Sequence, residues 1–206
     1  MSMLLSQLLN RPCAADPVIT GVTADSRKVR PGFLFAALPG SQVDGRSFIP
    51  GAIAAGAAAI LAPEDVQDLP VPAAHAGDLR RAYALAAAQF WRDQPATCVA
   101  VTGTNGKTSV AGFARQIYAR LGRKAASMGT LGVVVSAPGA PDLQLTPPGL
   151  TTPDAADVAE MMARLAGLGV THLAVEASSH GIDQRRLDGV RLAAAGFTNF
   201  TQDHLD

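Results

Sequence analysis

The sequence predicts an α/β protein made of a small N-terminal α/β unit, residues 1–94, and an incomplete parallel-sheet unit, residues 95–206. Three observations predict this class. Short apolar strand candidates alternate with helix-like segments, and a glycine-rich loop stands between a strand and a helix in the second unit. The composition, 48% hydrophobic and 17% charged, is sufficient to form a buried core.

The first unit opens with strand candidates at residues 18–23 and 33–38, separated by a polar, turn-rich segment. A helix-like segment at residues 48–58 and a short buried strand at residues 59–62 follow. These segments predict a small sheet with helical cover.

Asp78 is expected to cap the next helix, since aspartate accepts hydrogen bonds from the free N–H groups of a first turn. Apolar residues recur along this helix at helical spacing, and Pro95 follows as a helix breaker. Residues 94–96 are therefore expected to link the units. The apolar face is Leu79, Ala82, Tyr83, Ala86 and Phe90.

The second unit begins with an apolar strand at residues 98–102, a loop at residues 103–109 and a helix that Gly122 is placed to stop. The apolar residues at helical spacing in this helix are Val110, Phe113, Ala114, Ile117 and Leu121.

Beyond it, residues 131–135 and 143–146 form a candidate strand pair, and residues 154–168 a helix. Strands are expected at residues 171–176 and 193–200, and this alternation favours a parallel sheet. A doubly wound nucleotide-binding domain usually has more strands and helices than this, so we expect a fragment of a longer enzyme.

The segment Gly103-x-x-Gly106-Lys107-Thr108 has the strand–loop–helix context of a phosphate-binding loop. Glycines let successive backbone N–H groups turn toward phosphate oxygens, and the helix N-terminus adds partial positive charge. Lys107 can reach the terminal phosphates of ATP, and the Thr108 hydroxyl can ligate Mg²⁺. The usual pattern has glycine where this sequence has Val101, so the loop is a shortened form.

Charge and motif content exclude several classes of protein. Lys plus Arg and Asp plus Glu are both 17, which argues against a general nucleic-acid binder. The two cysteines, Cys13 and Cys98, are interpreted as thiols in a reduced cytosol. We expect a cytoplasmic protein, because no signal peptide or membrane-spanning segment is visible. Adjacent Ser178, Ser179 and His180 do not make a serine-hydrolase triad.

The segment Thr102–Thr108 resembles the shortened phosphate loop of the Mur ligase family, which includes folylpolyglutamate synthases. Glu176–Gly181 and Asn199–Asp206 resemble the second and third nucleotide-site segments of that family, in the expected order. Upstream, Thr23–Arg27 and Asp44–Arg46 are similar to its UDP-binding domain. The resemblance covers nearly the whole chain.

The resemblance implies an ATP- and Mg²⁺-dependent amide ligase of peptidoglycan precursor synthesis. Met128–Gly132 and Thr151–Pro153 point to the member that extends UDP-N-acetylmuramoyl-L-alanyl-D-glutamate with a diamino acid. ATP would phosphorylate the glutamate side-chain carboxylate, and an amine of meso-diaminopimelate or lysine would displace the phosphate. The region that selects the amino acid is expected beyond Asp206, so this monomeric chain is expected to be catalytically silent or nearly so.

The resemblance also assigns roles to residues of this sequence. Lys107, Glu176 and His204 are implied to be catalytic, and Thr108 and Glu176 to hold Mg²⁺. The ATP-binding residues would be Gly103, Thr104, Asn105, Gly106, Lys107, Thr108 and Ser109. The substrate-binding residues would be Ala24, Ser26, Ser41, Gln42 and Val43 at the uridine, and Thr151, Thr152, Ser178, Gln184 and Arg186 at the muramoyl dipeptide.

Alternatives stay open at the sequence level. Glu176 is otherwise a surface glutamate, His204 a turn histidine, and Thr152 a helix cap with Pro153 in the first turn. For the whole protein the alternatives are a sister ligase that adds D-alanyl-D-alanine, a folylpolyglutamate synthase, or a regulatory NTPase that forms no amide.

Overall fold

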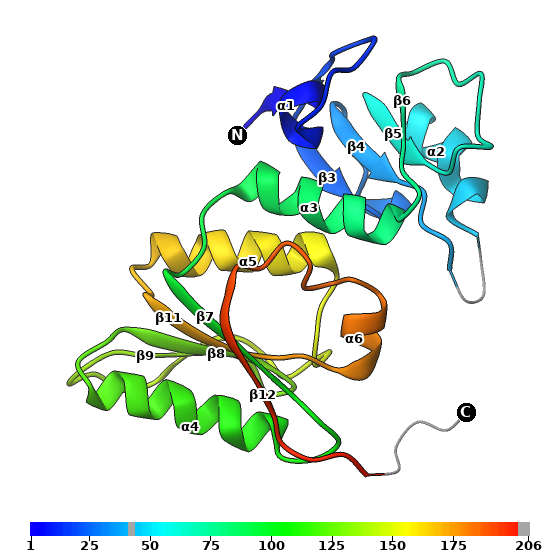
Figure 1. Ribbon diagram of the computed structural model, residues 1–206. Helices are drawn as coiled ribbons and strands as arrows, with labels where there is room; N and C mark the ends of the chain where they lie inside the picture. Colours follow the sequence, from blue (N-terminus) through cyan, green and yellow to red (C-terminus); the bar gives the residue numbers. More distant parts are fainter. Residues whose placement is uncertain (41–43, 202–206) are drawn as a thin grey trace. The chain divides into compact units, whose positions relative to one another are not determined.

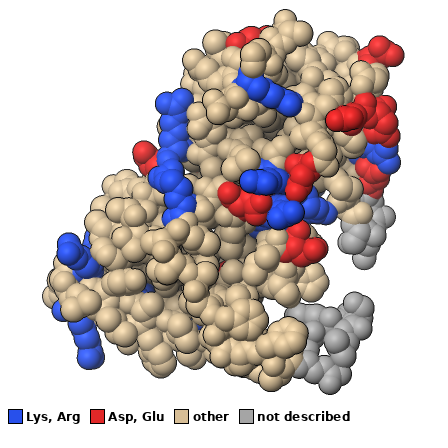
Figure 2. All heavy atoms as spheres, in the orientation of Figure 1, with Lys and Arg blue, Asp and Glu red and all other residues tan. Residues whose placement is uncertain are grey.

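The computed structural model describes residues 1–40 and 44–201, and the chain divides into two compact units, Met1–Arg92 and Asp93–Asp206 (Figure 1). Both units are α/β with parallel strands, so the predicted fold class is confirmed. Among the described helices, none has the length and apolar character needed to cross a bilayer. On the face in Figure 2, basic and acidic side chains lie interspersed among uncharged residues.

The first unit is built on a four-stranded parallel sheet in the order β3-β4-β5-β6, with β1 and β2 forming a separate antiparallel pair. Its elements are β1 (Met3–Leu4), α1 (Leu5–Leu9), β2 (Val18–Ile19), β3 (Gly21–Thr23), η1 (Ser26–Lys28), β4 (Phe33–Ala36), η2 (Gly45–Phe48), α2 (Ile49–Ala54), β5 (Ala59–Ala62), β6 (Ala73–His75) and α3 (Leu79–Trp91).

The two faces of this sheet bury different helices. Phe35 and Ile60 belong to the core cluster that includes Ile49 and Ala52 of α2. Side chains alternate along a strand, so Leu34 and Leu61, both fully buried, point to the other face. Helix α3 contacts β3 and β5 as well as α1.

The expected start of α3 is confirmed, since the Asp78 side chain accepts from Arg81 N at 3.0 Å. Leu79, Tyr83, Ala86 and Phe90 are buried along it, as their spacing predicted, and Ala82 is half-buried. The helix ends at Trp91, before Pro95, because Arg92 takes a positive φ of 60°.

The single strand expected at residues 18–23 is interrupted at Thr20. Thr20 N donates to Gly32 O at 2.8 Å, and its hydroxyl donates to Pro31 O at 3.0 Å. These bonds draw Thr20 out of both ladders, so β2 pairs with β1 whereas β3 joins the main sheet.

The second unit has a six-stranded sheet in the order β10-β9-β8-β11-β7-β12. Strands β8, β11, β7 and β12 are parallel, and β9 and β10 add an antiparallel edge, which confirms the expected strand pair. Its elements are β7 (Thr97–Thr102), α4 (Lys107–Arg120), β8 (Ala125–Gly129), β9 (Gly132–Ser136), β10 (Leu143–Thr146), α5 (Ala155–Gly167), β11 (His172–Glu176), α6 (Ser179–Asp183) and β12 (Leu192–Phe197).

Helices α4 and α5 lie on opposite faces of this sheet (Figure 1). The α5 face holds the main core, where Met162 and Leu165 pack with Leu173 and Val175 of β11. On the α4 face the helix presents Ala111 and Arg115, both buried. The small alanine lets α4 approach the strands closely.

The expected helix α4 is present, but its large apolar residues point away from the sheet. Val110, Phe113, Ile117 and Leu121 are 42%, 60%, 57% and 69% exposed. Strand β12 is exposed along its whole length and is hydrogen-bonded to β7 alone among the described strands. We call these four side chains the α4 stripe, and the last of them, Leu121, is the C-cap residue just past α4.

Candidate functional site

The loop from Gly103 to Thr108 follows β7 directly and leads into α4. Gly103 and Gly106 have φ values of +125° and +85°, which only glycine adopts readily. A Cβ on Gly103 would also come within 2.2 Å of Thr198 Oγ1. Gly106 is the N-cap of α4, so the free N–H groups of the first helical turn face this loop.

Lys107, the first residue of α4, lies over this loop. Its Nζ donates to Gly103 O at 2.6 Å and to Thr104 O at 2.9 Å. The ammonium therefore sits at the helix N-terminus among the glycines, where an anion would meet both the charge and the N–H groups.

Glu176 ends β11, the strand beside β7, and its side chain is 3% exposed. The carboxyl ends of adjacent parallel strands share one edge, so the carboxylate reaches the loop. Thr108 Oγ1 donates to Glu176 Oε2 at 2.9 Å, and Thr130 N donates to Oε1 at 3.1 Å. The interpretation of Glu176 as a surface glutamate is wrong, because this side chain is buried.

Gly129 has no side chain, and the Glu176 carboxylate occupies the space where one would lie. A Cβ on Gly129 would lie 2.0 Å from Glu176 Oε1, far inside van der Waals contact. A side chain at position 129 would thus displace Glu176 from the loop.

The donor set fits Mg²⁺. A carboxylate and a threonine hydroxyl are hard oxygen ligands, and Mg²⁺ commonly takes one or two protein ligands with water and phosphate oxygens in the other positions. Within residues 1–40 and 44–201 no group of three or more His, Cys, Asp or Glu side chains could hold a metal by itself. His204 lies outside the described residues.

Thr198 and Asn199 follow β12, which lies on the side of β7 opposite β11, and both contact the loop. Asn199 Oδ1 accepts from Asn105 N at 3.1 Å, and Asn199 Nδ2 donates to Asn105 O at 3.0 Å. Thr198 Oγ1 lies 2.6 Å from Asn105 O. Sequence reasoning gave Thr198 no role and placed Asn199 only within a family segment, since these contacts join residues more than 90 positions apart.

The five residues expected at the dipeptide lie near one another and near Glu176. Thr152 is 1% exposed, and its hydroxyl donates to Glu176 O and accepts from Ser178 N, both at 3.0 Å. Arg186 Nη1 donates to Thr152 O at 2.5 Å, and Nη2 donates to Gln184 Oε1 at 2.7 Å. Thr151 Oγ1 lies 2.9 Å from Thr130 Oγ1.

The interpretation of Thr152 as a helix cap is wrong. Asp154 caps α5, accepting from Ala156 N at 3.0 Å, and Pro153 precedes that cap. An aspartate two residues later supplies a stronger acceptor, which leaves the Thr152 hydroxyl for the loop after β11. Ser178 in turn caps α6, accepting from Gly181 N at 3.1 Å.

In the first unit, Ala24 and Ser26 flank Asp25. Ala24 N donates to Tyr83 Oη at 3.1 Å, and Asp25 Oδ1 accepts from Arg27 N at 3.0 Å, which caps η1. Side-chain hydrogen bonds from Arg27 lower the pKa of Asp25 to about 2. Ser41, Gln42 and Val43 lie outside the described residues.

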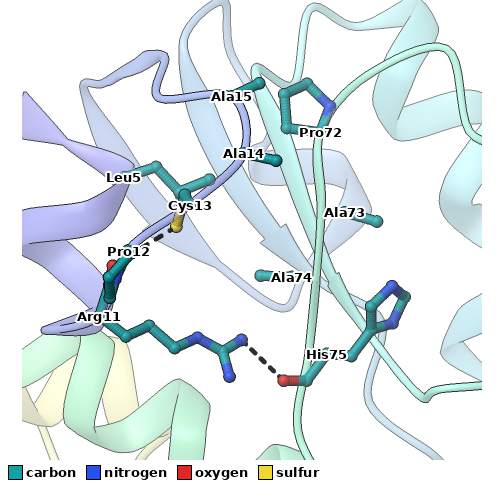
Figure 3. A pocket seen from close by; sticks show the side chains of 10 residues that line it. All are labelled: Leu5, Arg11, Pro12, Cys13, Ala14, Ala15, Pro72, Ala73, Ala74 and His75. Carbon is teal, nitrogen blue, oxygen red and sulfur yellow. Dashed lines mark hydrogen bonds between the residues drawn. The ribbon is translucent and has the colours of Figure 1, made fainter.

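The first unit also contains a cavity of about 380 Å³ between the loop after α1 and β6 (Figure 3). Alanine and proline side chains form much of its lining, and Arg11 Nη2 donates to His75 O at 2.7 Å across one end. Burial, and then the charge of Asp16, raise the pKa of the Cys13 thiol, which disfavours the reactive thiolate. Ala24 and Ser26, the two described residues expected at the uridine, do not line this cavity.

Two family descriptions match the sequence: "Mur ligase middle domain" over residues 101–206 and "Mur ligase family, catalytic domain" over residues 18–90. The 2,6-diaminopimelate ligase of Caulobacter vibrioides, which acts on UDP-N-acetylmuramoyl-L-alanyl-D-glutamate, is 75% identical over 100% of this chain and 43% of its own length. The ligase of the same name from Bradyrhizobium diazoefficiens is 51% identical over 99% of this chain and 42% of its own length.

Among solved structures, a ligase of that name superposes with a TM-score of 0.83 at 29% identity, covering 100% of this chain and 42% of the other. A MurF ligase from Thermotoga maritima in complex with ADP shares the fold, with a TM-score of 0.57 at 20% identity over 97% of this chain and 40% of its own. The chain thus spans about two fifths of the length of the proteins it matches.

Proposed function

Because this chain belongs to the Mur ligase family, we propose that it carries the ATP-binding loop and part of the acceptor site of an ATP-dependent amide ligase. The full reaction joins 2,6-diaminopimelate to UDP-N-acetylmuramoyl-L-alanyl-D-glutamate in the cytoplasm, as a step of peptidoglycan precursor synthesis. Diaminopimelate is favoured over lysine because both curated relatives described above are named for it.

The Thr108–Glu176 contact beside a glycine loop is the observation that carries the nucleotide part of this proposal. Two oxygen ligands suited to Mg²⁺ lie 2.9 Å apart, next to an ammonium group and a helix N-terminus. In ATP-binding loops of this form the phosphates accept from backbone N–H groups, and we assign that role to Gly103–Ser109.

The chemistry follows from the weakness of a carboxylate as an electrophile. Transfer of the γ-phosphoryl group to the glutamate side-chain carboxylate gives an acyl phosphate and ADP. An amine of diaminopimelate then attacks the acyl carbon, and the C–N bond forms as phosphate leaves and the nitrogen loses one proton to solvent. Lys107 offsets the negative charge on the phosphoryl group during its transfer. Thr108 and Glu176 would hold Mg²⁺, which supplies further charge stabilisation.

The acceptor substrate is assigned to both units. In the second unit we place its peptide beside Thr151, where the N–H groups of Arg186 that are not used on Thr152 and Gln184 can donate to a substrate carboxylate. Thr152 and Ser178 are assigned mainly to shaping that loop, since their hydroxyls are engaged with the protein. In the first unit the uridine is assigned to Ala24, Ser26 and the segment 41–43.

A chimeric ligase tests this function at the level of the whole reaction. This chain would replace the matching 43% of the Caulobacter vibrioides ligase, to which it is 75% identical. We expect phosphate release that requires both the UDP-linked dipeptide and diaminopimelate, and a loss of about 100-fold in Lys107→Ala. Lys124→Ala, which removes a lysine beyond the far end of α4, is the matched control.

Substrate replacement separates the alternatives. Turnover with D-alanyl-D-alanine, or with a folate and glutamate, would identify a sister ligase. ATP hydrolysis that is indifferent to the UDP-linked dipeptide would identify a regulatory NTPase and overturn the ligase assignment.

A further inference from the structure

The tight turn between β8 and β9 has no role in the function proposed above. Gly129 pairs with Gly132, so only Thr130 and Leu131 form the connection. Gly132 takes a φ of +79°, and a Cβ there would meet Thr146 O at 2.2 Å. The turn therefore packs closely against Thr146, the last residue of β10, and Pro147 after it.

Thr130 contacts the site with its backbone and its side chain. Its N–H donates to Glu176 Oε1 at 3.1 Å, and its carbonyl oxygen accepts from Gly149 N at 3.1 Å. Its Oγ1 lies 2.9 Å from Thr151 Oγ1 and 3.4 Å from Glu176 Oε2. One exposed turn residue thus joins the buried carboxylate to the loop of residues 149–151.

The direction of these hydrogen bonds follows from the groups involved. A carboxylate only accepts, so the single hydrogen of Thr130 Oγ1 points to Glu176 and its lone pair accepts from Thr151. Thr108 donates to the same Oε2 from the phosphate loop. The result is a continuous chain from Thr151 through Thr130 and Glu176 to Thr108.

We infer that Thr130 is a positioning residue that couples the binding of the Mg-nucleotide to the binding of the UDP-linked peptide. This inference rests on the proposed function, which assigns the nucleotide to Thr108 and Glu176 and the peptide to Thr151. Either ligand would fix its end of this series of hydrogen bonds, and the second ligand would then meet a loop that is already ordered. Coupling of this kind is reciprocal, so each ligand tightens the binding of the other by the same factor.

The test is calorimetry on the 206-residue chain. The Kd of Mg-AMP-PNP, a non-hydrolysable ATP analogue, is measured alone and with saturating UDP-N-acetylmuramoyl-L-alanyl-D-glutamate. We expect the dipeptide to tighten nucleotide binding by about fivefold or more in the natural chain. Thr130→Val keeps the side-chain shape without the hydroxyl and is expected to reduce that factor below about twofold. Thr130→Ser restores the hydroxyl and is expected to restore the factor.

The possible results separate this inference from the function on which it rests. If Mg-AMP-PNP does not bind the natural chain, the proposed function fails and the inference fails with it. If both ligands bind without affecting each other, or if Thr130→Val keeps the full factor, the inference alone is overturned. If Thr130→Val loses the circular dichroism of the native fold, Thr151→Val serves instead. It removes the Thr151–Thr130 hydrogen bond from the loop side and must also abolish the coupling.

Discussion

The Arg115–Asp142 ion pair joins α4 to the β9–β10 hairpin, and its two ends are buried unequally. The Arg115 side chain is 8% exposed and that of Asp142 51% exposed. Arg115 Nη1 donates to Asp142 Oδ2 at 2.5 Å and also to Ser136 Oγ, and Ser136 Oγ donates to Asp142 Oδ1 at 2.5 Å. Arg115 Nε is buried with no hydrogen-bond partner among the described residues.

This asymmetry predicts that Asp142→Ala destabilises the hairpin more than Arg115→Met. Loss of one partner of a fully buried pair costs about 3–5 kcal/mol, and the solvent around Asp142 reduces this to roughly 2 kcal/mol for Asp142→Ala. Arg115→Met leaves a half-solvated carboxylate that keeps the Ser136 hydroxyl, and it removes the unsatisfied Nε. Its cost is about 0.5–1 kcal/mol, because the two hydrogen bonds that Arg115 donates are lost while the cost of burying its charge is removed.

Hydrogen exchange followed by mass spectrometry measures this locally, in peptides that cover β9 and β10. We expect exchange about 30-fold faster in Asp142→Ala and no more than about fivefold faster in Arg115→Met. Arg120→Met, which changes an exposed arginine of α4, should leave the rate unchanged. Equal or faster exchange in Arg115→Met than in Asp142→Ala would show that the unequal burial of the two side chains does not set their contributions.

Three further predictions concern the α4 stripe, the glycine at the end of β8 and the turn in the first unit. Phe113→Ser combined with Ile117→Lys should raise the solubility limit of the chain severalfold and change the free energy of unfolding by less than about 0.5 kcal/mol per site, because both side chains are mostly exposed. Light scattering that is unchanged from the natural chain would contradict this. Gly129→Ala should weaken Mg-nucleotide binding about tenfold or more in calorimetry, since its methyl group would displace the Glu176 carboxylate. The control Gly112→Ala adds a methyl group with nothing within 4 Å and should leave binding unchanged. The hydrogen bonds that lower the pKa of Asp25 to about 2 should stabilise η1 fully above about pH 4, and this stabilisation should be lost as pH falls through 2. An NMR titration of the Asp25 carboxyl group with a midpoint near 4 would contradict this prediction.

Local signals in the sequence predicted those parts of the fold and site that depend on neighbouring residues. The strand–glycine–lysine–threonine–helix order around Lys107 places the loop at the end of β7 without any tertiary information. Asp78 likewise predicted the first residue of α3, because a cap acts on N–H groups within its own turn.

Features set by tertiary contacts were not predictable in this way. Strand β8 reads Ala-Ala-Ser-Met-Gly, with little strand propensity, and it is a strand because β11 and β9 pair with it on both sides. Periodicity predicted α4 but not which of its faces packs, and Ala111 rather than Phe113 meets the sheet. Thr130 was placed only within the family segment Met128–Gly132, without a contact, because its hydrogen bond to Glu176 spans 46 positions.

We propose that the loop from Gly103 to Thr108 binds the phosphates of ATP with help from Lys107, Thr108 and Glu176. The most direct test is calorimetric titration of the 206-residue chain with Mg-ATP, beside Lys107→Ala and a sample with Mg²⁺ removed by chelation. We expect saturable binding that weakens about tenfold or more in Lys107→Ala and also weakens without Mg²⁺. An absence of binding in the folded natural chain, or identical affinity in all three samples, would contradict it.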